Sequence, residues 1–358
     1  MLSRLHPLPL FLRAATGGAA MLAISACGEG TGPSPEDNRF GITATGPGVL
    51  SVSPLDTSTH FGGSPLGYLA PPGHVLPTDH VYLYFVDPWG FQPQGRDCSP
   101  RPVRAAGSGV VTFILVTEAA GDTKVNVQMT RTFQYYYDHV ILKPGIVVGT
   151  HVNAGDTIAT TTGRCPSIDL GVFDLDVTNS GLVNTTRYGM SSLHAASPYK
   201  YFSEPLRTWM YNHVRMMEGV PANKDGRVDW GIRGRLVGDW FHASLAGESA
   251  NVIGGPAGWT KSLSFAYDWY DNTQRRISIG GSIAPAGVVR VAPTDPAFGD
   301  VQVTSGVVAY QTTKTMGSIT DGWLLVQMTA EDRLRVQYFP GATARPLAFT
   351  AAAHDYVR

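Results

Sequence analysis

Histidine and aspartate side chains gather in three short stretches of the sequence. They are His74, Asp79 and His80 in GHVLPTDH, His139 at the end of YYYDH, and Asp169 in IDLGVFD. Imidazole and carboxylate groups can hold a metal ion or transfer protons. These five side chains are therefore the first candidates for a reactive site.

The segments that would position these side chains are of β type. Residues 135–142 are rich in aromatic and β-branched residues, which favour strands. Further along the chain, VNAGDTIA places the apolar Val152 and Ile158 on either side of turn residues. Gly155 within it can adopt the positive φ that a tight turn requires. We therefore expect two strands joined through this turn, followed by a further strand at residues 168–174.

In this order of parts the chain resembles the lysostaphin-type zinc metallopeptidases. In that family an aromatic residue and a His on one strand precede a V-x-x-G-(D/Q)-x-I-(A/G) turn, and a short strand with H-x-H completes the zinc site. The segment VRAAGSGVV, residues 103–111, is similar to a further turn of the family. The resemblance covers roughly residues 48–190. It implies a duplicated hybrid motif fold and, in active members, a zinc-bound water that attacks a peptide bond.

The last strand departs from the family pattern. His139 matches the strand-end catalytic histidine, although a structural histidine that bonds the backbone is an equal alternative. Asp169 stands where the family has its second catalytic histidine, and Gly171 stands where it has a zinc ligand. An alternative register places Asp174 and Asp176 there, which would point two carboxylates to one face and suit Ca²⁺ or Mn²⁺ better than zinc. We expect a degenerate metal centre.

The early ligands also depart from the pattern, because the family places an Asp four residues after the first His. Four residues after His80 comes Tyr84, and four after His74 comes Thr78, while Asp79 directly precedes His80. His74, Asp79 and His80 are therefore candidate metal ligands only if loops bring them together. We expect no cofactor in an inert domain, and zinc if the domain is active.

The N-terminus has the pattern of an export signal. Arg4 and Arg13 flank an apolar run that ends in ISACG, which looks like a bacterial lipobox with Cys27 as the lipidated residue. We expect residues 1–26 to be a signal peptide and the Gly/Pro-rich residues 27–47 a flexible tether. The product would be exported and lipid-anchored to a bacterial membrane, either periplasmic or on the cell surface.

Cysteine usage fits that compartment. With Cys27 assigned to lipid, Cys98 and Cys165 remain, and two thiols in an oxidising environment usually pair. We predict one disulfide between them. Charged residues are only 15% of the chain, the net charge is −1, and the sequence shows no run of Lys and Arg, so nucleic acid is excluded as an expected partner.

The rest of the sequence predicts a mostly β chain with a single linking helix. Its 41 Gly and 25 Pro favour short strands and turns. Residues 203–219 carry apolar residues at helical spacing, with His213 on that stripe expected to be a packed core histidine. Evenly spaced strands then predict an antiparallel barrel or sandwich. The expected organisation is a peptidase-like domain at 48–195, the linking helix at 196–222 and a C-terminal β domain at 223–358.

Two weaker features lie in the C-terminal part. Gly238-Asp239-Trp240 is similar to the G-x-W opening of lipocalin-type barrels, although a Trp that fills a barrel end is the simpler interpretation. Asp225 and Asp229 could suggest calcium, but the full D-x-D-x-D-G pattern is absent.

Three functions follow from these observations. The leading hypothesis is a cell-envelope lipoprotein whose peptidase-like domain no longer hydrolyses and serves as a binding or scaffold module, with peptidoglycan or an envelope protein as partner. Tyr82, Tyr84, Tyr135 and Tyr137 could line its groove, or belong to the core. The alternatives are an active metallo-endopeptidase with an atypical ligand set, and a small-ligand carrier in the C-terminal β domain.

Overall fold

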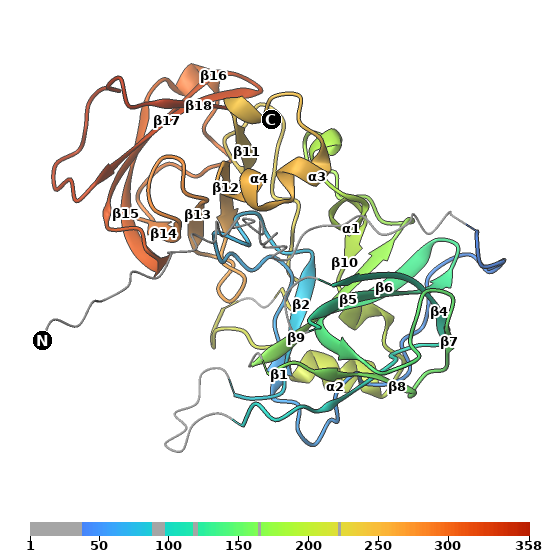
Figure 1. Cartoon of the computed structure of the whole chain (residues 1–358). Coiled ribbons are helices and arrows are strands. Elements are labelled where there is room, and N and C mark those ends of the chain that lie inside the picture. The colour runs from blue at the N-terminus through green and yellow to red at the C-terminus, as the bar shows by residue number, and fades with distance from the viewer. Residues whose placement is uncertain (1–37, 88–96, 117–120, 164–165, 221–222) are drawn as a thin grey trace, which may run out of the picture.

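The structure is a computed structural model that describes residues 38–87, 97–116, 121–163, 166–220 and 223–358 (Figure 1). The predicted signal peptide, Cys27 and Cys165 lie outside these residues. Lipidation and the Cys98–Cys165 disulfide therefore stay predictions. Among the described residues, no helix has the length and apolar character needed to cross a membrane.

The first domain is built on one ten-stranded, antiparallel sheet whose main path runs β1-β2-β9-β6-β5-β4-β7, with β3, β8 and β10 joined at its sides (Figure 1). Its strands are β1 (Gly62–Gly63), β2 (His80–Tyr84), β3 (Pro102–Arg104), β4 (Gly109–Val116), β5 (Thr123–Thr130), β6 (Phe133–Leu142), β7 (His151–Val152), β8 (Thr157–Thr161), β9 (Ser167–Asp174) and β10 (Ala195–Ala196). The turn between β7 and β8 contains Gly155 at φ +92°, as the sequence predicted. The strand-rich fold class is confirmed.

The central strands are covered on both faces. The sequence of β5 alternates Val125 and Val127 with Lys124 and Asn126, and all four are buried. The valines belong to the apolar core, together with Tyr135 and Tyr137 of β6. The polar face of β5 is therefore inside the molecule, where each polar group needs a partner.

The predicted helix forms over fewer residues than expected. Helix α2 spans Leu206–Asn212 and ends where His213 stacks on Trp209 and its Nδ1 bonds the Trp209 carbonyl. The chain cannot continue the helix because its next residues pair with Gly63 of β1. The prediction that the helix reaches residue 219 was wrong. Helix α2 packs on the first domain, on the side away from the barrel (Figure 1), so it does not bridge the domains.

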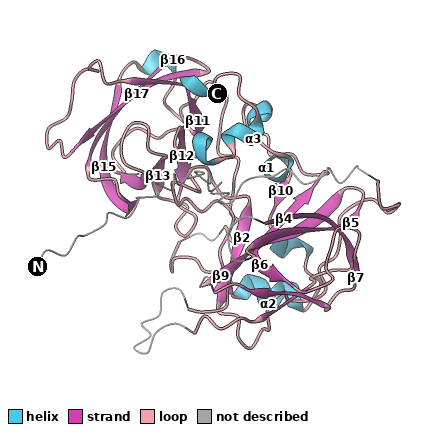
Figure 2. Cartoon of the chain, viewed as in Figure 1, coloured by secondary structure: helices cyan, strands magenta, loops and turns pink. Residues whose placement is uncertain are grey.

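The C-terminal part is a closed, antiparallel barrel of eight consecutive strands (Figure 2). They are β11 (Gly238–His242), β12 (Ser262–Tyr267), β13 (Arg275–Ile279), β14 (Gly287–Val291), β15 (Val308–Gly317), β16 (Gly322–Ala330), β17 (Arg333–Pro340) and β18 (His354–Val357). Inward residues such as Phe265, Ile277 and Tyr310 form one fully buried cluster. Trp240 fills the barrel near Arg358, whose guanidinium lies 4.0 Å from the centre of its ring. This position agrees with the simpler interpretation of Trp240, a Trp that fills a barrel end.

The two domains meet through the segments before and after β11. Short helices α1 (Met190–Leu193), α3 (Ala250–Ile253) and α4 (Pro256–Trp259) lie at this junction (Figure 1). An apolar cluster joins Leu182 and Tyr188 to Phe241, Leu245 and Ile253 of the barrel domain. The Tyr188 hydroxyl donates to Asp239 Oδ2 at 3.0 Å, so the contact between the domains contains a buried carboxylate.

Candidate functional site

Strand register brings the candidate residues together. Strand β9 lies between β2 and β6, with Gly171 opposite His80 and Asp169 opposite Asp138. Because directly opposite residues point to the same face of a sheet, side chains from three distant segments converge there. The site therefore combines residues that lie far apart in the sequence.

The converging side chains form a chain of ion pairs. Asp79 Oδ1 lies 3.1 Å from His80 Nδ1, and His80 Nε2 lies 3.2 Å from Asp169 Oδ2. The same Asp169 oxygen lies 3.6 Å from His139 Nε2, and His139 Nδ1 lies 3.0 Å from Asp122 Oδ2. Three carboxylates thus alternate with two imidazoles across the sheet. The contacts of Asp169 with the two histidines are electrostatic, because neither oxygen of Asp169 has hydrogen-bond geometry with a described group.

The backbone explains how His139 reaches this site. Among the described residues it is the one non-glycine residue with a positive φ, +62°. Up to Asp138, strand β6 pairs with β9, and from Val140 onward it pairs with β8. His139 is the point at which the strand changes partner. A left-handed residue without the freedom of glycine stores local strain, and such strain is concentrated at functional positions.

Electrostatics favours a charged His80. Burial alone would lower the pKa of His80, but the carboxylates of Asp169 and Asp79 outweigh it, and the pKa is raised. Burial would likewise raise the pKa of Asp79, yet its hydrogen bond with His80 and the charge of that imidazole hold it below its ordinary range. Burial raises the pKa of Asp169. His80 Nδ1 hydrogen-bonds Asp79, and Nε2 lies 3.2 Å from Asp169 Oδ2, so an imidazolium would balance the charge of a carboxylate on either side.

Tyr136 fills the space beside Gly171. A Cβ placed on Gly171 would lie only 2.0 Å from Cζ of the Tyr136 ring. The Tyr136 hydroxyl donates to Asp79 Oδ1 at 2.8 Å, and Lys124 Nζ lies 4.1 Å from the centre of the ring. Position 171 therefore has no room for a larger side chain, because an aromatic ring with a cation above it occupies the space.

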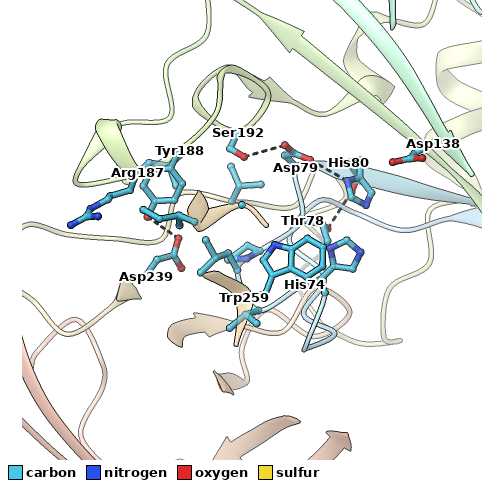
Figure 3. Close-up of a pocket in the computed structure, with 18 of the residues that line it drawn as sticks. His74, Thr78, Asp79, His80, Asp138, Arg187, Tyr188, Ser192, Asp239 and Trp259 are labelled. Atoms are coloured by element: carbon cyan, nitrogen blue, oxygen red, sulfur yellow. Dashed lines mark hydrogen bonds and ion pairs between the residues drawn. The ribbon is translucent and has the colours of Figure 1, made fainter. Parts of the chain in front are cut away.

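A small cavity lies beside this network, between the two domains (Figure 3). It measures about 70 Å³ and contacts Asp79, His80 and Lys124 of the first domain, and Asp239 and Trp259 of the barrel domain. Such a volume holds a few water molecules. Near it, the ring of His74 meets that of His80 edge to face, and burial lowers the pKa of His74 to about 3.

The geometry does not fit a zinc site of the predicted kind. Both nitrogens of His80 face carboxylates, and Asp79 also accepts hydrogen bonds from Tyr136 and from Ser192 at 3.1 Å. His74 contacts His80 through its ring, not through a shared point of coordination. Within the described part of the chain, one group of three could hold an ion, and it consists of Asp122, Asp138 and His139. Of the predicted residues, only His139 belongs to it.

Other predicted residues have structural roles. Asp174 accepts a hydrogen bond from the Tyr201 hydroxyl at 2.8 Å and one from the backbone of Asp176, so the D-x-D alternative does not form an open site. Asp225 accepts a hydrogen bond from the Tyr211 hydroxyl, and Asp229 forms an ion pair with Arg227. These contacts agree with an acidic turn and not with a calcium loop.

The aromatic residues divide by strand face. The hydroxyls of Tyr135 and Tyr137 bond the backbone carbonyls of Gly107 and Arg104 in the core. Tyr136, between them, faces the site. Tyr82 packs against the rings of His74 and His80. The YYYDH run contained a signal for Tyr136, because alternate strand residues point to opposite faces.

Asp122 and Lys124 were also missed. Asp122 belongs to a Gly-Asp turn and Lys124 lies at the start of β5, and nothing in their spacing links them to His139 or to Tyr136. Ser192 lies still further away, on the short helix α1. These three side chains reach the site through strand pairing and the fold of the linker, which the sequence alone does not reveal.

Comparison with known proteins gives limited results. No protein-family model matches the chain, and no curated protein matches it. Partial matches among solved structures include Helicobacter pylori Csd3 (20% identity, 36% of this chain, 32% of that chain, TM-score 0.25). They also include the catalytic domain of the antimicrobial peptidase lysostaphin from Staphylococcus simulans (19%, 33% and 81%, TM-score 0.23). A third is a variant catalytic domain of the M23 protein EnpA from Enterococcus faecalis (14%, 36% and 86%, TM-score 0.23).

These matches cover about a third of the chain, and for Csd3 about a third of the other protein. With TM-scores this low they carry no argument about function. The residues of the site itself must therefore carry it.

Proposed function

We propose that the chain is a cell-envelope lipoprotein whose peptidase-like first domain does not hydrolyse and serves as a binding or scaffold module at the cell wall. One observation carries the first part of this proposal. The ring of Tyr136 occupies the place above Gly171 that a zinc-binding side chain would need. A site that has lost a ligand could regain metal through water, but a site filled by a ring cannot.

The cavity supports the same conclusion. A volume of about 70 Å³ accepts waters but not a peptide. Residues of the barrel domain, including Ile253 and Trp259, line it, so the second domain covers the place where a peptide would have to enter (Figure 3). The cavity beside Asp79 and His80 therefore offers a peptide substrate no position, which favours a domain that does not hydrolyse.

The proposed location depends on the N-terminal sequence. A lipid on Cys27 would hold the mature chain at a bacterial membrane, and the following Gly/Pro-rich residues would let the domains reach the cell wall. Peptidoglycan or an envelope protein would be the partner. Pairing of Cys98 with Cys165 would then be expected in this oxidising compartment.

The test combines metal analysis with a digestion assay on the purified mature protein. We expect well below one zinc per chain, no release of products from muropeptides, and retention of the protein on sedimented peptidoglycan. The same assays on the His139→Ala variant should give unchanged results. Stoichiometric zinc, together with cleavage that His139→Ala abolishes, would overturn the proposal. Absence of cleavage without any retention on peptidoglycan would redirect the search to an envelope protein.

The active-enzyme alternative has one observation in its favour. Asp122, Asp138 and His139 offer ligand atoms that lie within 4.8 Å of one another. Their mainly oxygen donors suit a harder cation than the zinc of a peptidase. The small-ligand alternative loses support, because large side chains including Phe265 and Tyr310 fill the barrel where an apolar cavity would be needed.

A further inference from the structure

The outer face of the barrel contains a groove lined by three arginines. It measures about 900 Å³ and lies over one end of β13, β14 and β15. Its charged and polar lining residues are Thr273, Gln274, Arg275, Arg276, Arg290, Asp295, Gln311 and Thr313. The sequence shows no cluster of basic residues here, because Arg290 lies fourteen positions after Arg276 and only strand pairing brings them together.

Arg276 and Arg290 are direct cross-strand partners. Residues in such positions have Cβ atoms about 5 Å apart, and like charges placed there destabilise a sheet. A fold keeps this arrangement without cost only if something negative lies between or beside the two guanidinium groups. Asp268 accounts for part of this need, since its Oδ2 lies 2.8 Å from Arg276 Nε.

The two guanidinium groups still have unused donors. Arg276 Nη2 donates to Gln274 Oε1 at 2.7 Å, while the buried Nη1 of Arg276 has no hydrogen-bond partner among the described residues. Arg290 is exposed, and none of the described groups accepts a hydrogen bond from it. Buried cationic donors are seldom left unpaired, since the loss of hydration costs free energy. The buried Nη1 of Arg276 therefore points to a missing acceptor, and the exposed Arg290 beside it is available to contact the same group.

The third arginine holds the edge of the groove. Arg275 donates to the backbone carbonyls of Ala292, Asp295 and Pro296 at 2.6 to 2.8 Å, and so fixes the loop after β14. Asp295 on this loop is the one carboxylate that lines the groove, and burial raises its pKa. Among the groove-lining residues, three arginines therefore face one carboxylate, while Asp268 and Asp271 lie beside Arg276.

We propose that this groove binds the carboxylate or phosphate group of an anionic ligand between Arg276 and Arg290. The planar fork of a guanidinium matches the two oxygens of such a group. Thr313, the cross-strand partner of Arg290, adds a hydroxyl on the same row. A second groove of about 310 Å³ shares Gln274 and Arg276 and is lined by Tyr68, Trp269 and Tyr270, which leaves room for the uncharged remainder of the ligand.

The experiment titrates the purified mature protein with two probes, inorganic phosphate and acetate, at constant ionic strength. Binding is followed by the ¹H–¹⁵N NMR signals of the arginine side chains and by isothermal calorimetry. We expect saturable binding of one probe at least, with shifts at Arg276 and Arg290. Binding of phosphate alone or of acetate alone supports the site and identifies the oxyanion.

The main variant is Arg290→Gln, which changes an exposed side chain and should not affect folding. We expect its affinity to fall by a factor of about 10 or more, as loss of one charge-assisted pair implies. The matched control is Arg333→Gln, an exposed arginine on β17 of the same barrel, with affinity unchanged. Arg276→Lys keeps the charge but loses the fork, and should also weaken binding in a protein whose denaturation midpoint confirms folding. Absence of saturation by both probes, or equal losses in Arg290→Gln and Arg333→Gln, would overturn the site.

Discussion

Each domain of the protein has a buried centre, and the two centres are built from different chemistry. At the centre of the first domain, Asp79, His80, Asp169 and His139 face one another across three strands. The centre of the barrel is a contiguous apolar cluster in which Phe265 and Tyr310 are fully buried. Both are closely packed, but only the first has alternating carboxylates and imidazoles at its centre.

The difference matters because apolar packing alone would be enough for stability. Replacing buried ion pairs by apolar residues of similar volume is often neutral or stabilising. The barrel demonstrates that this chain can build such a core. Stability alone therefore does not explain the ionic centre of the first domain, and under the proposed function it is what remains of a reactive site. Its stability depends on every member being present.

The largest expected effect comes from removing the carboxylate that both histidines share. Asp169→Asn should lower the free energy of unfolding by about 3–5 kcal/mol, because it leaves two buried imidazoles facing an uncharged amide. Urea denaturation at neutral pH measures this change. Asp56→Asn is the matched control, since Asp56 forms an exposed ion pair with Arg104, and its midpoint should not move. An Asp169→Asn variant as stable as the wild type would refute the view that the network is interdependent.

The barrel contains a buried carboxylate, Asp239, and the pH dependence of stability that it causes tests the comparison. Burial raises the pKa of Asp239 from its ordinary 3.8 to about 6. The folded chain therefore keeps a proton that the unfolded chain has released, so stability falls as the pH rises from about 4 to about 6 and then levels off. The full difference amounts to about 3 kcal/mol. His80 of the first domain affects stability in a different pH range. Because its pKa is raised above 6.5 in the folded chain, the stability that it contributes is lost only as the pH rises above 6.5.

The measurement compares wild type with Asp239→Asn by urea denaturation at pH 4, 5, 6 and 7. The amide keeps one acceptor oxygen, so one of the two hydroxyls, Tyr188 or Ser264, must turn to accept from the new NH2 group. Because the amide does not titrate, the variant should gain stability relative to the wild type between pH 4 and 6. A difference between the two proteins that does not change with pH would contradict the assigned cause.

A smaller effect tests how tightly the ring of Tyr136 fills the space beside Gly171. Gly171→Ala should cost about 1–3 kcal/mol, since its methyl group has no room beside the ring. In the Tyr136→Ala background the same methyl group should be accepted, so the two changes together should cost less than their sum. Gly163→Ala is the control, because nothing lies within 4 Å of the added carbon. Strict additivity at positions 136 and 171 would mean that the ring is free to move away.

The sequence predicted the strands of the first domain and named Asp79, His80, His139 and Asp169, which the structure brings together. His139 was found because it ends an aromatic strand, and Asp169 because it follows the turn at Gly155. His74, Asp79 and His80 stay a prediction as metal ligands, and in the structure Asp79 and His80 pair with each other. Neighbouring residues can form a pair of this kind without any help from the rest of the fold.

What the sequence could not supply was register between distant strands. The contacts of Asp122 with His139, and of Arg276 with Arg290, depend on how far each strand slides along its neighbour. A slip of one residue would point each side chain to the other face of the sheet. The predicted C-terminal end of the helix was wrong for a related reason. The residues after position 212 pair with Gly63 and do not continue the helix, so a tertiary contact overrides the apolar spacing.

The smallest expected effect concerns the barrel interior, where polar atoms should be dispensable. The Tyr310 hydroxyl is buried without a hydrogen-bond partner among the described residues, so Tyr310→Phe should leave the free energy of unfolding unchanged or raise it by up to about 1 kcal/mol. Tyr356→Phe is the matched contrast in the same barrel, because its hydroxyl bonds Ser282 Oγ at 2.5 Å and its loss should cost about 1 kcal/mol. Urea denaturation of the two variants should therefore move the midpoint in different directions. If Tyr310→Phe destabilises as much as Tyr356→Phe, the hydroxyl of Tyr310 has a partner such as an ordered water, and the barrel centre is less purely apolar than its packing indicates.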